Sequence, residues 1–498
     1  MSADSLHYKS ITEISELIRR KEAKPSEITE AMLGRIAKLD GQFHGYALVL
    51  AERAMAQAKQ YDAEIAKGIW RGPLHGVPIG LKDLCYTSFA PTAGGTTIHA
   101  KFVPSFNATI VDRLEVAGAV TLGKLKMTEG AYTSHHPAIQ APLNPWNVNY
   151  WVGSSSTGSG VATSAGLCYG AIGSDTGGSI RFPSATCGLT GIKPTWGRVS
   201  RHGVFPLADS LDHVGPMCRS AADAAAMLGV IAGADINDPT ALRAPVPNYL
   251  AGIDDGIRGL RIGVDRRYTQ EGIDRHVVAA LVQAERTLAD LGADIREVHF
   301  PPYQKLVSQW IAMCSVETAE AHLDTYPSRK SEYGPDLAPA DRAGPGDERR
   351  RYCRDPSRAA EVQRQPRRHV RRYRSAADPD DAGADSDADQ DERIRRRPQR
   401  APEHSALHGG VRLLRQPDHH AADGHGLGPD AAQHAIGRPA SLRGRPGPRR
   451  RRVPVGDGLA YAAAADRIGD PQPVLSTFQN SGTGARTMSF SALRVAAG

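Results

Sequence analysis

The sequence predicts an α/β protein with a largely parallel sheet. One observation is the succession of a strand, a helix and a strand over residues 260–300, because two parallel strands need such a crossover between them. Another is the apolar run at residues 79–84, which is typical of a strand buried on both faces. A length of 498 residues would allow two or three domains, although large α/β enzymes of this size also fold as one.

Short strands alternate with helices from the start of the chain. Ile14, Leu17 and Ile18 form the apolar stripe of a first helix, and Pro25 opens a second helix that ends near residue 40. The further elements expected up to residue 125 are a strand at 46–50, a helix at 51–65, the buried strand at 79–84, a helix at 109–117 and a strand at 119–122.

The same pattern continues further along the chain. Residues 221–232 are mostly small and apolar and predict a helix. In residues 274–291 the apolar side chains recur at intervals of four and three, which predicts a helix that Gly292 ends. Strands at 260–264 and 295–300 complete this βαβ unit.

The composition narrows the classes of function. The six cysteines are scattered without a Cys-x-x-Cys pair, so we expect reduced thiols and neither disulfides nor a metal site. A catalytic cysteine would need a matching histidine, and no such constellation is evident. No run of about 18 apolar residues occurs, which predicts no membrane span. The first residues lack the features of a signal peptide, and we expect a cytoplasmic protein.

Two loops rich in glycine and hydroxyl side chains dominate the centre of the sequence. Residues 153–160 read GSSSTGSG, residues 173–183 read GSDTGGSIRFP, and a short apolar segment separates them. Glycine lets backbones approach closely, and Gly177 and Gly178 leave N–H groups uncrowded before Ser179, as a developing negative charge requires. Each loop alone could be a tight turn beside a packed helix, but the pair together favours a reaction site.

These loops resemble the amidase signature family. The resemblance spans about residues 11–337 and is densest at 72–217, where GPLHGVPIGLKD at 72–83 and GIKPTWGRVSR at 191–201 support it. It implies one domain over residues 1–337 with a large mixed, mostly parallel sheet sandwiched by helices. It also implies a cofactor-independent amidase that acts on a small-molecule amide, binds no nucleic acid and could form a homodimer.

The family's Ser–cis-Ser–Lys triad maps onto this sequence residue by residue. The nucleophile matches Ser179 and the lysine matches Lys82, which stands in an apolar run where an unpaired lysine is unusual. The bridging serine is less direct, because Ser154 stands where the family has a glycine. Alignment without a gap selects Ser155, whereas Ser154 or Ser156 would need a compensating insertion or deletion. Lys82 could alternatively be a surface lysine with a buried stem.

The implied chemistry is hydrolysis through an acyl-enzyme on Ser179, with Ser155 and Lys82 as the proton relay. Burial would lower the pKa of Lys82 and leave it neutral enough to act as a base. The expected oxyanion hole is a set of backbone N–H groups, those of Thr176, Gly177, Gly178 and Ser179. Asp175 and Arg181 are expected to fix this loop. Met127 and Tyr132 are candidates for the substrate pocket or, equally, for the core.

Two alternative functions stay open. The segment from residue 191 to 216 is also similar to the A subunit of a glutamyl-tRNA amidotransferase, which would imply partner subunits. Arg181 before Phe-Pro favours the plain amidase, because the amidotransferase pattern more often has glutamine there. The other alternative is an inactive pseudo-amidase whose C-terminal part is missing.

From about residue 338 the composition changes. Lys330 is the last lysine, no phenylalanine occurs between Phe300 and Phe478, and arginine, proline, alanine and aspartate dominate. A disordered basic tail for nucleic acid and a divergent domain are two interpretations. We favour a third, translation out of frame from a GC-rich gene. We therefore expect residues 338–498 to be aberrant, incomplete or disordered, and the net charge of +7 to say little about partners.

Overall fold

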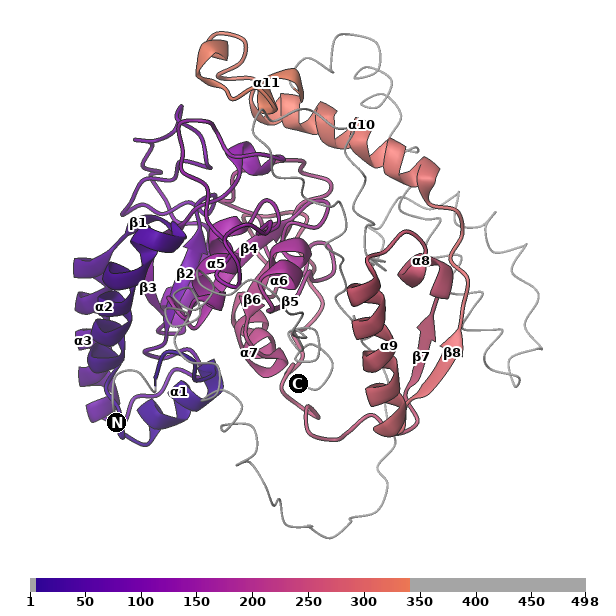
Figure 1. The fold of residues 1–498 in the computed structure, drawn as a ribbon. Coiled ribbons are helices and arrows are strands. Elements are labelled where there is room, and N and C mark those ends of the chain that lie inside the picture. Colours follow the sequence, from indigo (N-terminus) through magenta and orange to yellow (C-terminus); the bar gives the residue numbers. More distant parts are fainter. Residues whose placement is uncertain (1–5, 341–498) are drawn as a thin grey trace, which may run out of the picture.

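A six-stranded mixed sheet forms the centre of the fold in a computed structural model that describes residues 6–340 (Figure 1). The strand order is β1-β3-β2-β4-β6-β5. Their bounds are β1 Tyr46–Val49, β2 Pro78–Lys82, β3 Val120–Leu125, β4 Gly170–Asp175, β5 Thr190–Gly191 and β6 His213–Cys218. The central pairs β2–β3 and β2–β4 are parallel, and antiparallel pairs flank them. The predicted α/β class with a mixed sheet is confirmed.

Seven α-helices surround this sheet in the order of the chain. They are α1 Ile11–Arg19, α2 Pro25–Phe43, α3 Ala51–Ala66, α4 Thr109–Val116, α5 Thr157–Ser164, α6 Arg181–Thr186 and α7 Ala221–Ile231. Helix α1 begins at a capping box in which Ser10 and Glu13 bond each other's backbone N–H groups. Helices α2 and α3 pack together beside β3, α5 packs against β4, and α7 packs against β6.

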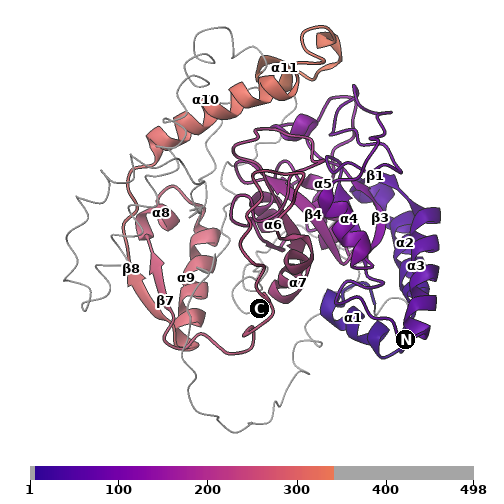
Figure 2. The same ribbon diagram turned by 180° about the vertical axis from the view of Figure 1, so that it is seen from behind.

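The predicted βαβ unit forms, but as a sheet of its own. Strands β7 (Arg261–Val264) and β8 (Asp294–Glu297) pair in parallel around helix α9 (Arg275–Asp290), with the short helix α8 (Arg266–Gln270) after β7. No residue of α9 is fully buried. Figures 1 and 2 show this unit on the opposite side of the molecule from α2 and α3. The sequence pattern predicted the unit correctly but not its separation from the central sheet.

Helix α10 (Gln304–Ala321) leads from the βαβ unit back toward the central sheet (Figure 2). The short 3-10 helix η3 (Lys330–Glu332) and helix α11 (Leu337–Ala340) follow it, and η2 (Glu129–Ala131) lies near the central loops. The tail predicted from residue 338 lies outside the described residues apart from its first three, and its out-of-frame origin stays a prediction. No helix within residues 6–340 is long and apolar enough to cross a membrane.

Two lysines are buried in the central sheet. Lys82 ends β2 and Lys124 stands in β3, and both side chains are 0% exposed. The alternative of a surface lysine at position 82 is therefore wrong. Because Lys82 and the end of β4 belong to neighbouring parallel strands, their carboxyl ends meet at one edge of the sheet, where loops gather functional side chains.

Candidate active site

Lys82 is surrounded by serine hydroxyls. Its Nζ lies 2.7 Å from the Oγ of Ser155, 2.9 Å from that of Ser156 and 2.8 Å from that of Ser174. All four side chains are buried. Ser174 belongs to β4, and Ser155 and Ser156 stand directly before α5, which begins at Thr157. The two loops that the sequence singled out thus converge on this lysine.

The environment of Lys82 favours its neutral form. Burial lowers the pKa of Lys82 from 10.5 to about 7, and the nearby Cys85, Asp212 and Asp175 only partly oppose this. No carboxylate within the described residues lies in ion-pair distance of its Nζ, whereas Lys124, the other buried lysine, pairs with Asp83 at 3.3 Å. A substantial fraction of Lys82 is therefore neutral near pH 7, and its role as a base stays a prediction.

Ser154, Ser155 and Ser156 are the three candidates for the serine between Lys82 and Ser179, and their hydroxyl groups have different partners. The Ser154–Ser155 peptide bond is cis. The Ser154 hydroxyl turns away and donates to the carbonyl oxygens of Tyr132 and Thr133, both at 3.1 Å. Ser156 Oγ donates to the Ser174 carbonyl at 3.2 Å and so has a structural partner of its own. Of these three, Ser155 is the one that contacts Lys82 without a further side-chain bond within the described residues.

Ser179 is held next to these groups by the backbone. The N–H of Ser156 donates to the carbonyl oxygen of Ser179 at 3.3 Å, which joins the two loops. The Ser179 side chain is half-buried, and its hydroxyl makes no hydrogen bond to another described residue. The structure therefore shows the bond from Lys82 to Ser155 but not the bond from Ser155 to Ser179. Catalytic hydrogen bonds often tighten only when substrate is bound.

Asp175 holds the loop that carries Ser179. Its carboxylate accepts from the N–H of Gly178 at 2.8 Å and forms a bidentate pair with Arg181 at 2.9 Å. Burial would raise the pKa of Asp175, but the Arg181 guanidinium holds it well below its usual range. Of the four N–H groups predicted for the oxyanion hole, that of Gly178 is therefore occupied. Those of Thr176, Gly177 and Ser179 have no hydrogen-bond partner within the described residues.

Two residues that the sequence analysis missed, Asp212 and Trp310, form hydrogen bonds to Thr176 at the other end of this loop. The Thr176 hydroxyl donates to Asp212 Oδ1 at 2.5 Å, and the Trp310 indole N–H donates to the Thr176 carbonyl at 3.2 Å. The indole ring also lies against Gly177, where an added Cβ would be 2.2 Å from its Cζ2 atom. No local motif marks either residue, because each meets the loop only through the tertiary fold.

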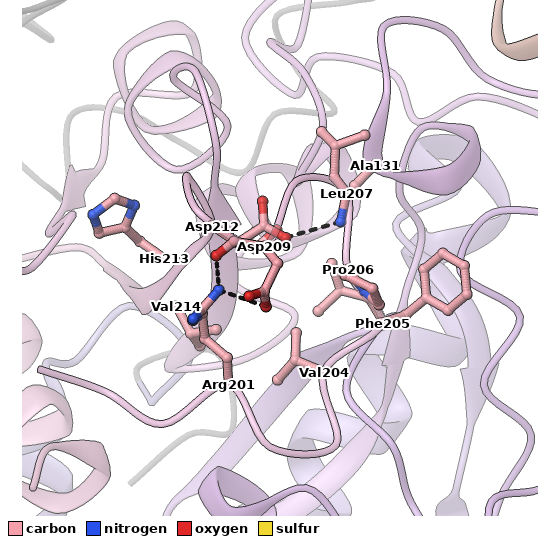
Figure 3. Close-up of a pocket in the computed structure, with 12 residues that line it drawn as sticks. Ala131, Arg201, Val204, Phe205, Pro206, Leu207, Asp209, Asp212, His213 and Val214 are labelled. Carbon is pink, nitrogen blue, oxygen red and sulfur yellow. Dashed lines mark hydrogen bonds and ion pairs between the residues drawn. The ribbon is translucent and has the colours of Figure 1, made fainter. Parts of the chain in front are cut away.

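A cavity of about 90 Å³ is lined in part by Ser174, one of the serines that contact Lys82 (Figure 3). Polar groups of Ser174, Asp212 and His213 line it together with apolar side chains such as Phe205. Of the pocket candidates, Met127 is 1% exposed and lies in the hydrophobic core, and Tyr132 packs partly buried against that core. Neither lines this cavity, and their role in substrate binding stays a prediction.

The described residues offer little for thiol or metal chemistry. The five described cysteines are free and buried, and burial raises the pKa of Cys85, Cys187 and Cys314 to about 12. Within residues 6–340, no group of three or more histidine, cysteine, aspartate or glutamate side chains is placed to hold a metal ion.

Comparisons with known proteins agree with this geometry. A family model described as Amidase matches residues 27–399. A Mycobacterium tuberculosis protein named "Putative amidase AmiD" is 52% identical over 335 residues, which are 67% of this chain and 70% of that protein. The A subunit of the glutamyl-tRNA(Gln) amidotransferase from a Geobacter species is 42% identical over 64% of this chain and 65% of its own length.

Solved structures show the same relationship. The native peptide amidase from Stenotrophomonas maltophilia superposes with a TM-score of 0.63 at 30% identity, covering 72% of this chain and 80% of that one. The family match, these relatives and the mixed α/β architecture all agree. The chain belongs to the amidase signature family, and its amidase relatives support a hydrolase that acts on amides.

Proposed function

We propose that this chain hydrolyses a carboxylic acid amide through an acyl-enzyme on Ser179, with Ser155 and Lys82 as its proton relay. One observation carries the proposal: a fully buried lysine with three serine hydroxyls and no carboxylate around its Nζ. A lysine needed only for charge would be expected to pair with an anion, as Lys124 pairs with Asp83. A neutral lysine bonded to a serine is instead suited to accept a proton.

The first half of the reaction forms the acyl-enzyme. Ser179 Oγ attacks the amide carbon while its proton passes to Ser155 and the Ser155 proton passes to Lys82 Nζ. When the tetrahedral intermediate collapses, the C–N bond breaks and the proton returns along the same route to the leaving nitrogen. In the second half a water molecule attacks the Ser179 ester and passes a proton to the same relay. The bond between the acyl carbon and Ser179 Oγ then breaks and the proton returns to Ser179 Oγ, which releases the acid.

The negative charge on the carbonyl oxygen needs donors that are fixed before the reaction. The N–H groups of Thr176, Gly177 and Ser179 are available for this role, whereas Asp175 holds that of Gly178. Removal of one such donor typically costs about 3–4 kcal/mol of transition-state stabilisation.

Covalent labelling tests the proposal. A fluorophosphonate should label Ser179 in the full chain, and Ser179→Ala should lose both the label and the release of ammonia from simple amides. Ser156→Ala is a matched control, because Ser156 also contacts Lys82 but should still allow labelling. A chelator should leave turnover unchanged. A label on a cysteine, or unchanged turnover in Ser179→Ala, would refute the acyl-enzyme.

A second candidate function is that of the A subunit in a glutamyl-tRNA amidotransferase. The similarity to the Geobacter protein supports it, although this chain spans only 65% of the length of that relative. Under this alternative, ammonia release would require glutamine and added partner subunits. Hydrolysis of simple amides by the chain alone favours the plain amidase, and no turnover under either condition favours an inactive pseudo-amidase.

A further inference from the structure

We propose that Asp212 is a positioning residue with two roles. It holds the Thr176 end of residues 176–179, here called the oxyanion loop, and it supplies a negative charge near Lys82. The inference rests on the proposed function, because it assigns a role within the same site. Neither the sequence motifs nor the comparisons mark this aspartate.

The sheet topology brings Asp212 to the loop. Strands β4 and β6 are antiparallel, and their register ends with Asp175 opposite His213. Asp212 and Thr176 are the next residues beyond this pair, and they meet across the end of the sheet. Two residues that are 36 positions apart in the sequence thereby form a 2.5 Å hydrogen bond.

The carboxylate of Asp212 is held by neutral donors. Besides the Thr176 hydroxyl, it accepts from the backbone N–H groups of Leu207 at 2.8 Å and Ala208 at 3.2 Å. No cationic side chain in the described part of the chain forms an ion pair with it. Arg201 lies nearby but bonds to Asp209 instead, as Figure 3 shows. Asp175, at the other end of the loop, is in contrast neutralised by Arg181.

The two ends of the loop are thus fixed in different ways. Asp175 holds the N–H of Gly178 and the segment after it, whereas Asp212 holds the side chain of Thr176. Between these anchors lies the N–H of Gly177, one of the free donors that the mechanism uses. A loss of the Thr176 anchor would let this segment shift, and a displacement of about 1 Å in a catalytic group can reduce the rate about a hundredfold.

Asp212 also lies close enough to Lys82 to influence its charge. Asp212 and Ser174 line the same cavity, and Ser174 contacts Lys82 Nζ at 2.8 Å. The other titratable or charged groups around Asp212 are Arg201, His213, Asp209 and Cys314. Burial raises the pKa of Asp212 to about 6, below the value of about 7 for Lys82, so Asp212 is mostly an anion at the pH values where Lys82 is mostly neutral. Its attraction opposes the effect of burial on the pKa of Lys82.

These two roles predict two separable effects of Asp212→Asn in the full chain. The amide keeps one acceptor but cannot serve all three donors, so kcat should fall about 10- to 100-fold with little change in KM. The loss of the negative charge should also move the acid limb of the pH–rate profile to lower pH. A residue with only a structural role would not move that limb.

Thr176 variants separate the anchor from the charge. Thr176→Val should show the fall in kcat without the shift of the acid limb, and Thr176→Ser should restore activity because it keeps the hydroxyl. The effects of Asp212→Asn and Thr176→Val on kcat should not multiply in the double variant. Both substitutions act on the same hydrogen bond, that between the Thr176 hydroxyl and Asp212. Asp294→Asn is the matched control, since this carboxylate is 47% exposed and belongs to β8, which does not line the cavity, and it should behave like the wild type.

The rate of fluorophosphonate labelling distinguishes the possible failures. If the wild-type chain is not labelled at Ser179, the proposed function fails. If it is labelled, and Asp212→Asn reacts equally fast with an unmoved acid limb, only the positioning role fails. If Asp212→Asn does not fold, the comparison of Thr176→Val with Thr176→Ser still tests the positioning role. Equal activity in these two variants would refute the role of the Thr176 hydroxyl as an anchor.

Discussion

The pH dependence of turnover is the sharpest test of Lys82 as a base. With a pKa of about 7, Lys82 is neutral in about 9% of molecules at pH 6, about half at pH 7 and about 91% at pH 8. An ordinary lysine with a pKa of 10.5 would be neutral in only about 0.03% of molecules at pH 7. Burial therefore increases the fraction of Lys82 that is neutral at pH 7 about 1,500-fold.

The sign of the dependence follows from the role of a base, which must be neutral to accept a proton. The value of kcat/KM for ammonia release should rise with pH, level off above about pH 8 and fall about tenfold per pH unit well below pH 7. The variant Lys82→Arg keeps a cation but cannot deprotonate, so its turnover should fall about 10³-fold on the plateau above pH 8 and should lose the rise near pH 7.

Lys193 provides the matched control for this experiment. Burial lowers its pKa to about 7 as well, but its Nζ donates to the carbonyl oxygen of Pro194 and contacts no serine of the relay. Lys193→Arg should therefore keep the rise in rate near pH 7. Loss of that rise in Lys193→Arg, or appreciable turnover in Lys82→Arg, would refute the assignment of Lys82 as the base.

Three further predictions concern the loop and the tail. Arg181→Gln leaves the buried Asp175 without its partner and should lower the free energy of unfolding by about 3–5 kcal/mol, which urea titration can measure. Gly177→Ala should reduce kcat strongly, because its Cβ would lie 2.2 Å from the Trp310 ring, and Trp310→Phe should partly restore it. An unchanged kcat in Gly177→Ala would contradict the close packing. Sequencing of the gene should reveal an insertion or deletion near codon 338, and an intact frame there would refute the out-of-frame origin.

Much of the central fold could be predicted because its signals are local. The strand that ends at Lys82 is a short apolar run, and the helices before it carry clear apolar stripes or a proline at their start. Lys82, Ser155 and Ser179 lie in motifs that align with the pattern of the family without a gap. The structure places Lys82 and Ser155 in contact, and the roles of all three residues stay a proposal.

What could not be predicted depends on contacts between distant segments. Trp310, Met313 and Cys314 of helix α10 are spaced for one helix face, but this spacing does not reveal that Trp310 contacts the loop at Thr176. Asp212 looks like an ordinary loop aspartate until the antiparallel register of β4 and β6 brings it to Thr176. Likewise, the separation of the βαβ unit from the central sheet is not encoded in its periodicity.

The contact between Trp310 and the oxyanion loop has a consequence for synthesis on the ribosome. The relay of Lys82 and Ser155 uses only residues that are made early, whereas the support of Thr176 by Trp310 must wait until 134 further residues have been added. Because domains generally fold as their segments emerge, the base can be in place before the loop is complete. A growing chain of this kind can bring the residues of the proposed relay together first and complete the support of the Thr176 segment last.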